Sequence, residues 1–155
     1  MHPNLDYELL AKQARALLED TDRLITKAAN FSALLYQEVP GLNWAGFYFL
    51  DGDTLWLGPF QGKPACTSIP VGSGVCGTAV ETGEVQRVAN VHDFEGHIAC
   101  DGDSRSELVV PLRREGEIFG VLDLDSPVTD RFSARDQAEI TRLAGIFEQA
   151  AAGSL

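Results

Sequence analysis

The chain has 155 residues and a formal net charge of −11. This length fits one compact domain, residues 1–155, with a substantial hydrophobic core. The negative charge disfavours nucleic acids and anionic membranes as partners, since both carry negative charge themselves. The N-terminal residues lack the basic and apolar regions of a signal peptide, and no apolar run is long enough to span a bilayer. A cytoplasmic, reducing compartment is therefore expected, in which cysteines stay free or cycle.

Two helices are predicted at the N-terminus. Three leucines mark the first: Leu5, Leu9 and Leu17. Asp20 or Thr21 is expected to cap the second, which should end before Pro40. Four apolar residues recur at helical spacing within this second helix: Leu24, Ala28, Phe31 and Leu35.

The middle of the chain changes to strand patterns. Residues 43–51 and 54–60 predict a β-hairpin, and 67–71 predict a short strand. Residues 72–83 indicate a loop, a short helix and a glycine stop, followed by a short strand over 85–91. Residues 106–112 and 117–125 predict a second hairpin, turned at 113–116. Ser133 should cap a final helix, so the fold class is α+β, with terminal helices around an antiparallel sheet.

Cys66, Cys76 and Cys100 lie in polar, glycine-punctuated stretches that are expected to form loops or element ends. An odd number of cysteines without an export signal favours thiol chemistry over a disulfide-stapled secreted scaffold. Cys100 precedes the strand of the second hairpin, so a nucleophile and a proton donor could share a pocket. The aspartates that follow it, Asp101 and Asp103, would raise the pKa of its thiol. Three unrelated free thiols are the alternative interpretation.

Three carboxylates are predicted to gather on one face of the second hairpin. Side chains alternate along a strand, so Asp123 and Asp125 share a face, and pairing about Gly116 brings Glu107 level with them. One interpretation is a solvated sheet face without a function. The other is a cluster whose mutual repulsion raises its pKa values, which suits a general acid or a site for a cationic group.

The first hairpin carries a pair of aromatic residues. Trp44 and Tyr48 are expected to share one face across Gly46, leaving room for a ligand between aromatic walls. Aromatic rings attract cations and methyl groups bonded to sulfur. Burial in the core is the competing interpretation, and composition favours it.

Other motifs are weaker. Residues 72–77 match the dinucleotide-binding spacing GxGxxG, but the predicted antiparallel hairpins do not fit the parallel sheet that this motif requires. A zinc site could be drawn from Cys66, Cys76, His97 and Cys100, although no CxxC pair is present. His92 and His97 flank a loop, where a structural hydrogen bond is the usual role and a contact with a ligand carboxylate is the alternative.

Taken together, these features resemble one family. The stretches NWAGFYF, GPFQGKPACTSIPVGSGVCGTA, VHDFEGHIACDGDSRSELVVPL and GVLDLDSP are similar to free methionine-(R)-sulfoxide reductases, which are small cytoplasmic enzymes made of a single GAF domain. All three cysteines and the second hairpin appear together and in order. One departure is Glu95, where the family would have proline. The resemblance implies a GAF-like α+β fold, no metal or organic cofactor, and an assembly compatible with a homodimer.

The resemblance also implies a role for each cysteine. Cys100 is the nucleophile that attacks the sulfur of free L-methionine-(R)-sulfoxide, and Cys66 resolves the resulting sulfenic acid as a disulfide with Cys100. Cys76 assists recycling, and a thioredoxin-like dithiol reduces the disulfide.

The remaining implied site residues are carboxylates and aromatics. Glu107, Asp123 and Asp125 would surround the sulfoxide group, while Trp44 and Tyr48 would lie near the substrate methyl. A rival interpretation is a GAF domain that senses a small molecule without catalysis.

Overall fold

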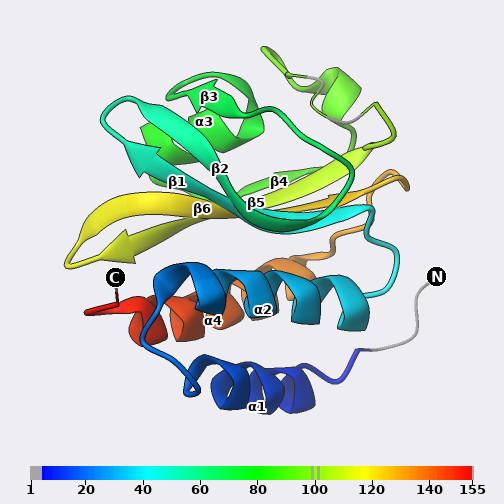
Figure 1. Ribbon diagram of the computed structural model, residues 1–155. Coiled ribbons are helices and arrows are strands. Elements are labelled where there is room, and N and C mark those ends of the chain that lie inside the picture. Colours follow the sequence, from blue (N-terminus) through cyan, green and yellow to red (C-terminus); the bar gives the residue numbers. More distant parts are fainter. Residues whose placement is uncertain (1–4, 99, 101, 155) are drawn as a thin grey trace.

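The computed structural model describes residues 5–98, 100 and 102–154. An antiparallel sheet lies between α2 and α4 on one side and α3 with its neighbouring loops on the other, and α1 packs on the outer side of α2 and α4 (Figure 1). The helices are α1 (Tyr7–Leu18), α2 (Leu24–Glu38), α3 (Gly74–Thr82) and α4 (Ala134–Ala151), with a 3-10 turn, η1, at Val91–Asp93. The predicted α+β class is confirmed, and α1, α2 and α4 lie on the same side of the sheet, with α2 and α4 packed against it. None of the helices described here is long and apolar enough to cross a membrane.

The sheet has six strands in the order β3-β2-β1-β6-β5-β4. Their bounds are Trp44–Asp51 (β1), Thr54–Gly62 (β2), Ser68–Pro70 (β3), Gln86–Val88 (β4), Ser106–Arg114 (β5) and Glu117–Ser126 (β6). All the pairings are antiparallel. The GxGxxG spacing at residues 72–77 therefore lacks the parallel βαβ setting of a dinucleotide site.

Strand alternation divides the core into two clusters. Ala45, Phe47, Leu122 and Leu124 point toward α2 and α4, where the larger cluster lies. Trp44, Tyr48 and Val121 belong to the smaller cluster under α3 and the neighbouring loops. Both faces of the central strands are thus covered, so a polar side chain on either face is removed from water.

The N-terminal prediction needs two corrections. The face that α1 buries carries Tyr7, Leu10, Ala14 and Leu18, while Leu9 is 52% exposed. Leu17 is exposed as well. The helix packs on α2 and α4 and not on the sheet, and this contact selects the stripe. Helix α2 begins at Leu24 after Arg23 without a side-chain cap, so neither Asp20 nor Thr21 caps it.

The later elements follow the predictions closely. Ser133 and Asp136 form a reciprocal capping box at the start of α4. Strand β5 extends to Arg114, so the hairpin turn is shorter than the predicted 113–116. Glu115 and Gly116 form this turn with φ of 53° and 80°. Two successive residues with positive φ match the twist of the flanking strands.

Candidate functional site

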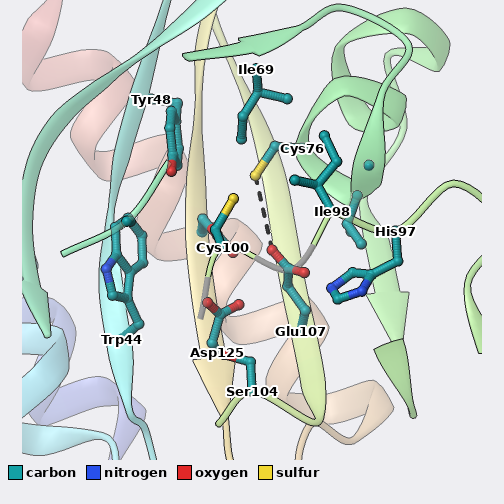
Figure 2. Close-up of a pocket in the computed structure, with 14 residues that line it drawn as sticks. Trp44, Tyr48, Ile69, Cys76, His97, Ile98, Cys100, Ser104, Glu107 and Asp125 are labelled. Carbon is teal, nitrogen blue, oxygen red and sulfur yellow. Dashed lines mark hydrogen bonds between the residues drawn. The ribbon is translucent and has the colours of Figure 1, made fainter. Parts of the chain in front are cut away.

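A small pocket opens on the sheet face beneath α3. It is lined by side chains from β1, β5, β6, the first turn of α3 and the loop before β5 (Figure 2). Its interior volume is about 40 Å³, enough for roughly three water molecules. All six catalytic candidates except Cys66 line this pocket, as do both aromatic candidates. The fold therefore brings together residues that are far apart in the sequence.

The carboxylates form one buried cluster. Glu107 pairs directly with Asp125 across β5 and β6, as the symmetry about Gly116 predicts. Glu107, Asp123 and Asp125 are 8%, 5% and 9% exposed. The interpretation as a solvated sheet face is therefore wrong, because α3 and the loops cover this face.

Burial sets the electrostatics of the cluster. It raises the pKa of Glu107 well above its usual range, and the charges of Asp123 and Asp125 raise that pKa further. Burial also raises the pKa of Asp123, while hydrogen bonds with Glu107 and other neighbours partly oppose this rise. Like charges in a desolvated site cannot all stay ionised, so the cluster retains a proton at pH values where an exposed carboxyl would have lost it. Such a proton is available for donation.

Cys76 lies inside the protein. It occupies the first turn of α3, is 3% exposed, and its Sγ is 3.9 Å from Glu107 Oε2 (Figure 2). Burial raises the pKa of its thiol strongly, and the charges of Asp123 and Glu107 add to the effect. The group is therefore held as a thiol, which is a much weaker nucleophile than a thiolate.

Cys66 and Cys100 are joined in a disulfide. Their Cα atoms lie 5.1 Å apart across a sequence separation of 34 residues, within the usual range for such a bond. Cys66 follows β2, and Cys100 precedes β5. This pairing removes two of the four ligands proposed for a zinc site, so the set of Cys66, Cys76, His97 and Cys100 is not assembled.

Hydrogen bonds hold the loop of Cys66 against β1. The Tyr48 hydroxyl donates to the Cys66 carbonyl at 2.9 Å, and Trp44 Nε1 donates to the Lys63 carbonyl at 3.2 Å. Lys63 also reaches Asp103, with Nζ 2.5 Å from Oδ2. The aromatic pair thus positions the loop of Cys66, in addition to forming the pocket wall.

The same ion pair changes the expected effect of acidic residues on Cys100. A hydrogen bond from Lys63 lowers the pKa of Asp103, and the opposite charge of Lys63 balances that of the carboxylate. Asp103 is therefore paired with a cation, which the sequence prediction did not include. Asp101, the other acid of that prediction, lies outside the described residues.

The aromatic walls are present, but the space between them is occupied. Trp44 and Tyr48 stack with ring centroids 6.0 Å apart, and both line the pocket. A Cβ built on Gly46 would lie 2.3 Å from Phe60 Cβ, and Phe60 stacks on Trp44 at 5.1 Å. The predicted room for a ligand across Gly46 is therefore filled by Phe60.

The two histidines have different surroundings. His97 lines the pocket, where burial and the neighbouring His92 lower its pKa and favour the neutral ring. His92 is exposed, and its Nε2 lies 3.3 Å from Arg105. Only His97 is placed to contact a molecule in the pocket.

Several pocket residues were not singled out from the sequence. Ile69, Val75 and Ile98 provide apolar walls, and Ser104 adds a hydroxyl. Ile98 has a local signal, since it stands two residues before Cys100. Ile69 and Val75 reach the pocket only because β3 pairs with β2 at the edge of the sheet and α3 packs over the sheet.

Comparisons with known proteins identify the family of this chain. The GAF domain family model matches residues 14–151. The free methionine-R-sulfoxide reductase of Escherichia coli is 50% identical over 92% of this chain and 87% of its own. The reduced form of the Staphylococcus aureus protein fRMsr superposes with a TM-score of 0.94, at 49% identity over 98% of this chain and 100% of its own.

A third relative was solved with its substrate. The free methionine-R-sulfoxide reductase of Neisseria meningitidis, in complex with its substrate, has a TM-score of 0.90 and 40% identity over 94% of this chain and 87% of its own. These matches cover nearly the whole chain. The chain therefore belongs to the GAF-domain family of free methionine-R-sulfoxide reductases.

Proposed function

We propose that this protein reduces free L-methionine-(R)-sulfoxide to L-methionine. The observation that carries the proposal is a cysteine pair, Cys66 and Cys100, whose second member lines a pocket with a buried carboxyl cluster. The named activity of the Escherichia coli relative and the substrate complex of the Neisseria meningitidis relative support it.

The first step is attack by the Cys100 thiolate on the sulfoxide sulfur. A protonated carboxyl of the cluster donates its proton to the sulfoxide oxygen, which weakens the S=O bond. The oxygen passes to Cys100 as a sulfenic acid, the substrate sulfur gains two electrons, and methionine leaves. Glu107, with its strongly raised pKa, is our choice for the donor.

The second step regenerates the thiol. Cys66 attacks the sulfenic acid of Cys100, forming the disulfide and releasing water. A thioredoxin-like dithiol then reduces this disulfide by exchange, so two external electrons balance each sulfoxide reduced. We place the protein in the cytoplasm, where such a reductant is present. We also propose a homodimeric assembly.

The remaining residues hold the substrate. Trp44 and Tyr48 provide an aromatic wall for the methyl group on sulfur, a contact that aromatic rings favour. Asp123 and Asp125 share the proton of the cluster and stabilise the positive character of the sulfoxide sulfur. Cys76 remains a thiol next to Glu107, where it can enter the exchange reactions after the first turnover.

The direct test is turnover with thioredoxin, thioredoxin reductase and NADPH, comparing free L-methionine-(R)-sulfoxide with its S epimer. We expect NADPH oxidation with the R epimer alone. Thiol titration during a single turnover without reductant should show the loss of two thiols as methionine appears. No turnover, with active reductase and three thiols retained, would contradict the proposal and favour a ligand-sensing domain without catalysis.

Cys66→Ser tests the resolving role. We expect pre-reduced Cys66→Ser protein to form one equivalent of methionine and then recycle with thioredoxin about tenfold more slowly or worse, because the sulfenic acid lacks its partner. Rapid-quench and steady-state measurements on the same sample separate the two phases. Normal recycling that disappears in the double variant Cys66→Ser/Cys76→Ser would assign the resolving role to Cys76.

A further inference from the structure

Three potential metal ligands meet in the pocket. Cys76 Sγ and one carboxylate oxygen each of Glu107 and Asp123 all lie within 4.8 Å of one another, and all three residues are buried. These three residues form a compact group of potential ligands within the described part of the chain. It differs from the zinc set considered from the sequence, since it uses neither member of the disulfide and no histidine.

Asp123 provides an independent sign of a ligand. The residue is 5% exposed, and no hydrogen bond from the described part of the chain reaches its buried Oδ1. A buried carboxylate oxygen without a partner is costly, and such atoms commonly accept a proton, a water molecule or a cation. The pocket volume of about 40 Å³ leaves space for water-sized occupants beside it.

One edge of the group has nearly the spacing of tetrahedral coordination. With Zn–S bonds of about 2.3 Å and Zn–O bonds of roughly 2.1 Å, neighbouring ligand atoms in a tetrahedral zinc site lie about 3.5 Å apart. The Cys76 Sγ to Glu107 Oε2 distance is already 3.9 Å. A contraction of this distance by a few tenths of an ångström would bring these two atoms to the separation in a tetrahedral site.

We propose that Cys76, Glu107 and Asp123 bind a thiophilic divalent cation, Zn²⁺ above all, and that the bound ion blocks the pocket against the sulfoxide. The inhibition, although not the binding, rests on the proposed function. Binding replaces the Cys76 S–H bond with an S–Zn bond, and both this proton and the proton held by the carboxyl cluster leave to the buffer. The fourth position stays open for water.

The donor set selects the type of metal. One sulfur and two carboxylate oxygens suit Zn²⁺, whereas Mg²⁺ and Ca²⁺ prefer oxygen alone and more ligands. The net charge of −11 raises the local concentration of cations around the protein. An ion held by Glu107 would also occupy the oxygen that we propose donates the proton, so binding and catalysis exclude each other.

Co²⁺ added to the disulfide form tests the site directly, because Cys76 is then the free thiol. We expect a thiolate-to-cobalt charge-transfer band that saturates at one equivalent and is displaced by Zn²⁺. Cys76→Ser should abolish the band, and Glu107→Gln should weaken binding by about tenfold or more. Glu117→Gln, an exposed change on β6, is the matched control and should bind normally.

The proposed metal site would be refuted if the folded protein shows no cobalt band. It would also be refuted if the band persists in Cys76→Ser. Thermal unfolding of each variant separates loss of a ligand from loss of the fold. The inhibition is tested in a single turnover of pre-reduced protein. The thiol reagent used for the reduction is removed beforehand, so that it does not bind Zn²⁺. Zn²⁺ should slow methionine formation, and EDTA or excess sulfoxide should restore it.

The two tests can fail separately. If the cobalt band forms but the metal-free protein shows no turnover, the metal site stands and the proposed function is refuted. Turnover that Zn²⁺ leaves unchanged, despite a saturated cobalt band, would refute the inhibition.

Discussion

Cys100→Ser is expected to abolish methionine formation, including the first turnover of pre-reduced protein. A serine hydroxyl is a far weaker nucleophile toward sulfur than a thiolate, and loss of a covalent nucleophile lowers the rate by about 10³-fold or more. Recycling chemistry does not contribute to this loss, since the first turnover needs no external reductant. Methionine is measured by rapid quench and amino-acid analysis in the absence of thioredoxin.

Cys66→Ser is the matched control, because it makes the same change at the other end of the disulfide. It should retain the first turnover that Cys100→Ser loses. Both variants lack the crosslink, so their unfolding temperatures should be similar. Full single-turnover activity in Cys100→Ser would move the nucleophile to another cysteine and refute our assignment.

Glu107→Gln is expected to slow the chemical step by about 10²-fold or more, because the amide keeps the shape of the side chain but cannot donate the carboxyl proton. The same change should increase the free energy of unfolding near neutral pH by about 1–2 kcal/mol. The folded protein carries a desolvated acid among like charges, and glutamine removes that cost. A loss of rate combined with a gain in stability distinguishes a catalytic acid from a structural one.

The pH dependence of this stability gain has a defined sign. Because the pKa of Glu107 is raised in the folded state, the folded protein binds more protons than the unfolded chain above about pH 4.3. Stability from this group is therefore complete at lower pH and is lost as pH rises toward the folded pKa. Glutamine does not titrate. The difference in free energy of unfolding between Glu107→Gln and the unmodified protein should therefore grow as pH rises from the unfolded pKa of Glu107 to its folded pKa.

Chemical denaturation at several pH values and single-turnover rates together measure both effects. Glu117→Gln, an exposed change in the same sheet, should alter neither the rate nor the stability by a comparable amount. Asp125→Asn changes the direct register partner of Glu107 and tests which carboxyl donates. If Glu107→Gln has a normal single-turnover rate and Asp125→Asn a slow one, Asp125 is the proton donor.

Features set by local periodicity were predictable from the sequence. Alternation along β6 puts Asp123 and Asp125 on one face, and the near-symmetry about Gly116 pairs Glu107 with Asp125. The buried stripe of α2 and the Ser133 cap of α4 depend in the same way on residues a few positions apart. The arrangement of the three carboxylates on one face was therefore predictable from the sequence, although their burial was not.

Burial and pairing between distant segments required the tertiary structure. Helix α3 and its loops cover the carboxyl face, which converts a set of acids into a desolvated cluster, and they place Cys76 against Glu107. Phe60 fills the space over Gly46, and contacts with α2 and α4 select the buried stripe of α1. The family resemblance indicated the Cys66–Cys100 pair, but no residue spacing did, because a separation of 34 residues is bridged only when the loops after β2 and before β5 meet. Local patterns fix which side of an element a residue occupies, whereas its solvation, and hence its pKa and reactivity, depends on which distant segment packs over it.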